Sequence, residues 1–181
     1  MPVFLAHLMT TGLGPFYDGL AHLFVTPEDL LPVLALSLAA GLRGPAGGRA
    51  VLFVLPAAWF AGTMLGRLFA PHWIWPVVSA GLTVSLGALA AIDRKLPTAV
   101  VAVLAAMLGL WNGSWNGIEL ARSGAAALGT GLGIACAAFV VVALLGAVAA
   151  AVRALWARIA VRVAGSWIAA AGLFMLGWAL R

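Results

Sequence analysis

The sequence predicts an all-α integral membrane protein, a polytopic helical bundle with six transmembrane helices and an N-terminal apolar segment that could add a seventh span. Hydrophobic residues make up 65% of the 181 residues and charged residues only 8%, against about 25% in a typical soluble domain. A helix needs about 20 mainly apolar residues to cross a bilayer, so the chain has room for six or seven spans. We expect residues 1–181 to form a single transmembrane domain.

Six apolar runs are bounded by charged residues, Pro or Gly, and each is expected to be a helix. They cover residues 28–42, 50–69, 74–92, 96–110, 124–152 and 159–180. The first 25 residues are also apolar, but Gly12, Gly14, Pro15 and Asp18 interrupt them. This first segment could be a further span, a re-entrant segment or a helix that lies along the membrane interface.

The basic residues predict the orientation of the bundle. If the six helices alternate in direction, seven of the ten Lys and Arg residues fall on one side, namely Arg43, Arg49, Arg94, Lys95, Arg153, Arg158 and Arg162. Basic loops face the cytoplasm, so we expect the other loops and the C-terminus outside, in a bacterial inner membrane. Basic residues spaced in this way are topology signals, and they do not indicate a nucleic-acid partner.

Four of the five acidic residues fall on the outer side, and only Asp93 falls on the inner side. Ionisable groups at membrane depth are costly unless they are paired or hydrated, and they often mark an ion path. Tryptophans also gather at the outer edge, as in an interfacial aromatic belt, namely Trp73, Trp75, Trp111 and Trp115. The outer side is therefore the place to look for a functional site.

The first polar cluster is DGLAHLFVTPEDLL. Asp18 and His22 are four residues apart, so they share a face if this stretch is helical. Thr26 suits the N-cap of the next helix, with Pro at the first helical position and Asp29 at the third, which approximates a capping box. Capping would explain a carboxylate at Glu28 or Asp29, but it would not explain His22.

The second polar cluster is WNGSWNGIE. Asn112, Asn116 and Glu119 follow i, i+4, i+7 spacing and would line one stripe of a helix. Gly113 and Gly117 lie between them and would let another backbone come close, as small residues do at membrane helix contacts. The amides could therefore bridge helices or contribute to a site.

These two clusters resemble the hallmarks of the HupE/UreJ membrane proteins, which are regarded as nickel or cobalt permeases. The first hallmark is a histidine followed, after five residues, by Asp-His and two leucines; in GLAHLFVTPEDLL, His22 matches the histidine, Glu28 the aspartate and Asp29 the second histidine. The second hallmark reads His-Gly-x-x-His-Gly-x-Glu, and WNGSWNGIE keeps its spacing through Glu119. Asn112 and Asn116 stand where that hallmark has histidines.

The resemblance implies a metal site at the outer face, and its residues are His22, Glu28, Asp29, Asn112, Asn116 and Glu119, with Asp18 as an auxiliary ligand. Three of the four hallmark histidines are replaced by Asp or Asn. Imidazole suits nickel, cobalt and zinc, whereas carboxylate and amide oxygens suit magnesium, calcium and manganese. A retained site should therefore prefer harder ions.

Two functions follow as hypotheses. The first is a permease for a divalent metal cation, and the second is a transport-inactive relative that serves as a structural or assembly subunit of a larger membrane complex. A stripe of small residues, Gly129, Gly131 and Gly133, would permit a homo-oligomer. The sequence contains no phosphate-binding Gly loop, CxxC, GxSxG or HExxH, so we expect neither an enzyme nor a bound cofactor.

Overall fold

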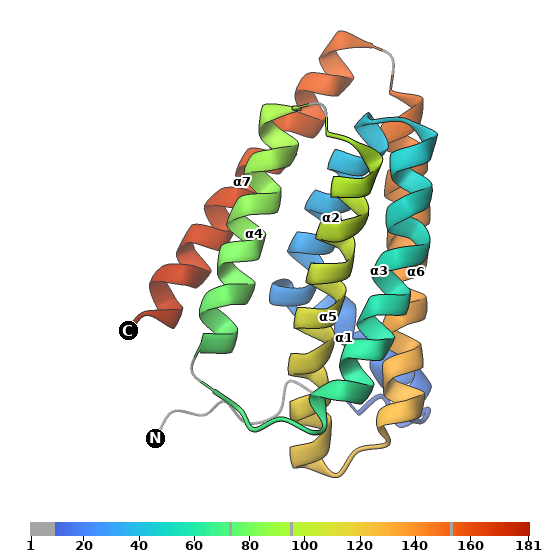
Figure 1. Ribbon diagram of the computed structural model, residues 1–181, viewed down its shortest axis with the longest axis vertical. Coiled ribbons are helices and arrows are strands. Elements are labelled where there is room, and N and C mark those ends of the chain that lie inside the picture. Colours follow the sequence, from blue (N-terminus) through green and yellow to red (C-terminus); the bar gives the residue numbers. More distant parts are fainter. Residues whose placement is uncertain (1–9, 73, 95, 153) are drawn as a thin grey trace.

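The computed structural model describes residues 10–72, 74–94, 96–152 and 154–181. Within these ranges the chain is all-helical, and its helices run side by side in one bundle (Figure 1). They are α1 (Pro15–Val25), α2 (Pro27–Leu42), α3 (Pro45–Gly66), α4 (Ile74–Ile92), α5 (Thr98–Ser123), α6 (Ala127–Ala151) and α7 (Leu155–Ala179). The predicted all-α membrane bundle is confirmed.

The spans differ from the expected ones at the N-terminal end. Helices α3 to α7 are each long and apolar enough to cross a bilayer, whereas α1 and α2 reach this length only as a pair that is bent by 73°. We expected residues 28–42 to cross alone, but α2 has 16 residues, fewer than the roughly 20 that a span needs. The described part of the first 25 residues thus forms, with α2, either a broken span or a re-entrant segment, and the described chain has six candidate spans if the pair counts as one.

Three helix pairs are held at close range by glycine: α3 with α5, α4 with α7, and α1 with α6. A Cβ atom on Gly113 would meet the Trp59 carbonyl oxygen, and one on Gly117 would meet the Thr63 carbonyl oxygen. The predicted role of these two glycines is therefore confirmed, with α3 as the neighbour. Such close contacts let backbones pack by van der Waals attraction where no hydrophobic effect drives helices together.

The glycine stripe on α6 is not an outward oligomer surface as we expected. Gly133 packs against α1, because a Cβ atom there would meet the Phe16 carbonyl oxygen, and Gly129 would place one 3.0 Å from Pro15 Cβ. Gly131 faces α3, where a Cβ atom would lie 3.1 Å from Thr63 Cγ2. Helix α1 therefore occupies much of the α6 surface that the sequence left open.

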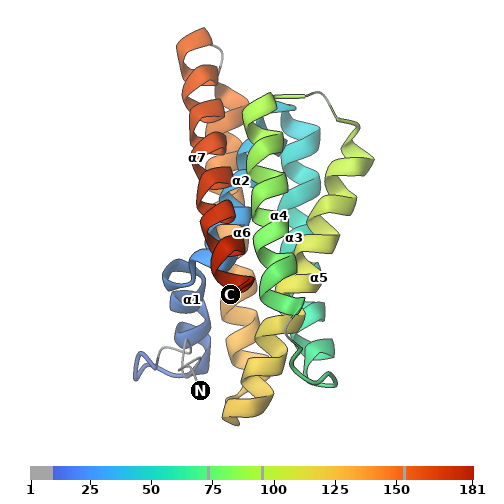
Figure 2. The ribbon, with the colours of Figure 1, turned by 90° about the vertical axis from the view of Figure 1, so that its left-hand side faces the viewer.

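Helix α2 lies at the centre of the bundle. It contacts each of the other six described helices, and Figure 2 shows it between the α4/α7 layer and α6. Its buried side includes Val33, Leu36 and Ala40. A polar group on the buried side of α2 is consequently shielded by the helices around it.

The loops that join α2 to α3, α4 to α5 and α6 to α7 lie at the same end of the bundle (Figure 1), which we call the basic end. Asp93 binds two arginines there: Oδ1 accepts from Arg43 Nη1 at 2.7 Å, and Oδ2 accepts from Arg158 Nη2 at 2.7 Å. The carboxylate thus ties the ends of α2 and α4 to the start of α7. Asp93 has a positive φ of 54°, a backbone region that Asp and Asn adopt more readily than most residues.

Replacing Gly113 by Ala should destabilise the protein by about 1 to 3 kcal/mol, because the added Cβ forces α3 and α5 apart. The matched control is Gly81→Ala, where a Cβ atom meets nothing within 4 Å. Since Ala favours a helix over Gly by about 1 kcal/mol, the control should be neutral or more stable. Thermal unfolding in detergent checks this, and equal melting temperatures for the two variants would contradict the close contact.

Replacing Asp93 by Asn should lower the stability by about 1 to 3 kcal/mol, the usual cost of a buried polar group that loses its partner. The Arg43 side chain is only 8% exposed, and its Nε and Nη2 atoms have no hydrogen-bond partner in the described chain. Asn adopts a positive φ as readily as Asp, so the loss of stability measures the removal of the negative charge and not a change in backbone strain.

The same variant has a defined pH dependence. Partial burial by itself raises the pKa of the Asp93 carboxyl, but hydrogen bonds from Arg158 and Arg43 and their charges outweigh it, so the pKa lies below its ordinary value of 3.8. Its contribution to stability is therefore complete above 3.8 and is lost as the pH falls through the lowered pKa. The difference in melting temperature between wild type and Asp93→Asn should shrink below this value, and a difference that is constant with pH would refute the ion pair.

Candidate functional site

The break between α1 and α2 brings two buried titratable side chains together. His22 lies in the last turn of α1 and Asp29 in the first turn of α2. Their side chains are 1% and 4% exposed, and His22 Nε2 lies 3.4 Å from Asp29 Oδ2. The bend of 73° therefore joins an imidazole and a carboxylate inside the bundle.

Helix α5 adds a third polar group to this pair. Asn116 Nδ2 donates to Asp29 Oδ2 at 3.0 Å, and both side chains are buried. One carboxylate oxygen of Asp29 thus lies next to both the imidazole and the amide. These three side chains, His22, Asp29 and Asn116, are called the central triad below.

Asn112 has a different partner, which a proline on α2 explains. Pro32 lies inside α2, and because proline has no N–H it cannot bond the carbonyl oxygen four residues earlier, which is that of Glu28. Asn112 Nδ2 donates to this same oxygen at 3.3 Å. The amide therefore supplies the donor that proline removes, in a place where no lipid group can do so.

The other end of the Asn112 amide is also engaged. Asn112 Oδ1 accepts from Ser79 Oγ at 3.2 Å, and Trp111 Nε1 donates to Ser79 Oγ at 3.2 Å. The chain of bonds runs from α2 through α5 to α4. Ser79 and Pro32 were not singled out from the sequence, although a proline inside an apolar helix signals an unbonded carbonyl four residues back.

Asp29 does not complete a capping box, which corrects the expectation from TPED. Thr26 is the N-cap and Pro27 the first residue of α2 as predicted, but the cap has no side-chain hydrogen bond. The Asp29 carboxylate points instead to Asn116 and His22. Its place in the first turn still lets the positive end of the helix dipole stabilise its charge.

The second polar cluster lies inside α5, which continues to Ser123 and does not end at residue 110 as expected, so Asn112, Asn116 and Glu119 are helical as their spacing indicated. Asn116 lies about 10 Å along the helix from Ser123, at 1.5 Å per residue. The tryptophans beside the cluster stack on one another: the Trp75 ring centroid is 4.2 Å from that of Trp111 and 6.2 Å from that of Trp115. Trp73, the fourth member of the expected aromatic belt, lies outside the described residues.

The remaining predicted ligands, Asp18, Glu28 and Glu119, lie close in sequence to members of the triad. Asp18 Oδ1 accepts from the backbone N and Oγ1 of Thr11, at 2.6 and 2.7 Å. Glu28 is exposed and Glu119 is partly exposed. In the part of the chain that the structure describes, no three His, Cys, Asp or Glu side chains form a group able to hold a metal ion, so any ligand set there must include amides, hydroxyls, carbonyls or water.

The sequence profile of the HupE / UreJ protein family matches residues 1–175. The chain belongs to the HupE/UreJ family. This is a family of nickel and cobalt transporters and not of enzymes, in agreement with the resemblance of the two polar clusters. No curated protein and no solved structure matches the chain. As a family member it keeps the hallmark spacing, with His22 at its histidine position and oxygen-bearing side chains at the other three.

Asn112→Ala should destabilise the protein by about 1 to 3 kcal/mol, because the Glu28 carbonyl oxygen then loses the hydrogen bond from this amide. In a Pro32→Ala background the same change should cost less, since alanine at this position restores the N–H that can bond this oxygen within the helix. A double-mutant cycle by thermal unfolding measures the difference. Equal losses of stability in both backgrounds would show that the Asn112 amide does not compensate for the N–H group that Pro32 lacks.

Proposed function

We propose that this HupE/UreJ family member is a permease for a divalent metal cation, and that the central triad is its binding site. The observation that carries the proposal is the break between α1 and α2, with His22 and Asp29 on either side of it, buried and 3.4 Å apart. Discontinuous helices with polar groups at the break are the common design of substrate sites in secondary transporters. Ionisable residues inside membrane spans are rare, and they mark substrate or ion pathways by default.

The chemistry of the triad suits a cation. Asp29 supplies a negative charge, His22 an imidazole nitrogen, and Asn116 an amide that presents its oxygen when it turns by a half rotation. The C-terminal end of α1 adds the partial negative charge of its last carbonyls. Glu28, Asp18 and Glu119 would attract hydrated cations toward this site by raising their local concentration.

The ligand types support an ion harder than the usual cargo of the family. Two of the three triad groups offer oxygen, and manganese and magnesium favour oxygen ligands and retain bound water. The imidazole nitrogen of His22 is also a suitable ligand for nickel and cobalt. We propose that the site accepts divalent ions that bind both oxygen and imidazole ligands, with oxygen from water completing the coordination shell.

We further propose that the basic end faces the cytoplasm of a bacterium, so that the C-terminus lies outside the inner membrane. Arg43 and Arg94 lie in the loops at this end, and Arg158 lies in the first turn of α7, as the positive-inside rule requires. The cation would then approach from the opposite, acidic side. Release at the basic end requires a rearrangement of the helices, since Asp93 ties α2, α4 and α7 together there.

The alternative is a transport-inactive structural or assembly subunit. Asn112 favours it, because both ends of its amide are engaged in bonds that hold helices together. Under this alternative Asn116 would serve only to bridge α5 and α2. The two functions differ in whether the triad binds an ion at all.

Metal binding to the purified protein tests the proposal. Calorimetry with nickel, cobalt, zinc, manganese, magnesium and calcium should show saturable binding of at least one ion, and Asp29→Asn should reduce this affinity at least tenfold, the effect of about 1.4 kcal/mol. The matched control is Asp93→Asn, the same chemical change at the other end of the bundle. It should bind as wild type does even though it is less stable.

A gain-of-function variant tests the ligand assignment. Asp29→His combined with Asn116→His restores two hallmark histidines and should shift the preference toward nickel and cobalt. Uptake into proteoliposomes then separates transport from binding alone. If no ion binds the wild type more tightly than Asp29→Asn, metal transport is excluded and the assembly function takes its place.

A further inference from the structure

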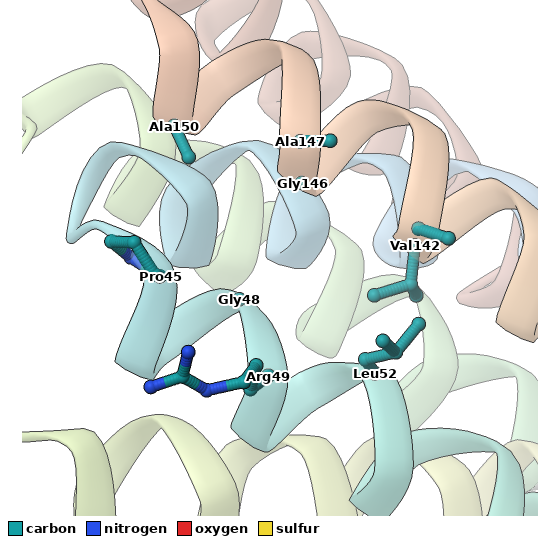
Figure 3. Close-up of a pocket in the computed structure, with 9 residues that line it drawn as sticks. Pro45, Gly48, Arg49, Leu52, Val142, Gly146, Ala147 and Ala150 are labelled. Atoms are coloured by element: carbon teal, nitrogen blue, oxygen red, sulfur yellow. The ribbon is translucent and has the colours of Figure 1, made fainter.

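A groove of about 300 Å³ opens between the first turns of α3 and the last turns of α6, at the basic end of the bundle (Figure 3). This volume is at the lower end of the range for ligand pockets. Small and apolar residues form most of the lining, which consists of Pro45, Gly48, Arg49, Leu52, Val142, Ala143, Gly146, Ala147 and Ala150. The groove is thus an apolar depression on the side of the bundle, with one arginine beside it.

Positive charge is concentrated at the mouth of this groove. Arg49 is exposed, and its side chain extends toward the Pro45 end of α3 (Figure 3). The first turn of α3 contains no acidic residue, and its N-cap, Gly44, makes no side-chain hydrogen bond. The positive end of the α3 dipole therefore adds to the charge of Arg49.

Within the described chain, the one carboxylate at this end is already paired with arginines. Asp93 is the only acidic residue there, and both its oxygens accept from Arg43 and Arg158. No described hydrogen bond or ion pair engages Arg49, and no described residue that lines the groove is acidic. A second copy of this chain would thus have no free carboxylate at the basic end to place against Arg49.

We propose that this groove binds an anionic phospholipid of the leaflet at the basic end. An acyl chain lies against Leu52 and Val142, and the phosphate pairs with the Arg49 guanidinium at the first turn of α3. An amphiphile with an apolar chain and an anionic head matches both halves of the site, whereas a zwitterionic lipid carries a cation next to its phosphate. The proposal stands independently of metal transport, because α3 and α6 contribute nothing to the central triad.

Native mass spectrometry of the full chain in detergent tests the site, with dioleoylphosphatidylglycerol and dioleoylphosphatidylcholine as probes. The wild type should retain phosphatidylglycerol more tightly. Arg49→Gln should weaken its retention about fivefold, the effect of one basic residue beside an anionic lipid. The matched control is Arg94→Gln, which removes an exposed arginine at the same end and should leave retention unchanged.

A second pair of variants tests the apolar half. Gly146→Leu should fill the groove and reduce retention of both lipids, because a Cβ atom at Gly146 meets nothing within 4 Å and the variant can fold. Gly81→Leu, at an equally open position on α4, should have no effect. Circular dichroism and gel filtration establish that each variant is folded.

Several outcomes would overturn the proposal. Equal retention of the two lipids by the wild type would exclude selection for the net negative charge of the headgroup, and equal losses in Arg49→Gln and Arg94→Gln would show diffuse attraction in place of a site. Unchanged retention in folded Gly146→Leu would exclude the groove. A wild-type dimer that Gly146→Leu converts to a monomer would show that a second copy occupies it.

Discussion

A carbonyl oxygen inside a bilayer must find its hydrogen-bond donor within the protein, because no water is present to supply one. Pro32 creates this need at the Glu28 carbonyl, and Asn112 meets it from α5. This bond joins α5, which packs mainly against α3, to the start of α2. Asn116 lies one helical turn further along the same face, so its amide reaches Asp29, the residue next to Glu28.

The same segment of α5 serves two neighbours at once. In the pairs Asn112-Gly113 and Asn116-Gly117, consecutive residues point about 100° apart around the helix. The asparagines face α2 and the glycines face α3, where they meet the carbonyl oxygens of Trp59 and Thr63. Because residues four apart lie on nearly the same face of a helix, each Asn-Gly pair makes one polar contact with α2 and one close contact with α3. This explains why the Asn-Gly pair recurs after four residues in WNGSWNG.

The sequence predicted helices α2 to α7, the Thr26 N-cap with Pro27 after it and the close packing at Gly113, because composition and local spacing carry these features. It ended the apolar run at residue 110, although the polar spacing indicated a helix through WNGSWNG, because asparagines lower the mean hydropathy of a helix that is apolar on its other faces. It did not predict the partner of Asp29, because the competing cap is local and the bond to Asn116 spans 87 residues. The Gly129 and Gly133 contacts were missed because α1 was not assigned as a helix.

Under the proposed function the two asparagines have unlike roles, and the difference links binding to movement. Asn112 is engaged at both ends, by the Glu28 carbonyl and by Ser79, so it keeps α2, α4 and α5 in place. Asn116 gives its N–H to the oxygen of Asp29 that a cation would need. A bound cation would replace this donor and turn the Asn116 amide. The contact between α5 and α2 would then change at Asn116, while the Asn112 contact one turn away stays in place. Binding would then act on the bend between α1 and α2, where a small rotation moves a half-span.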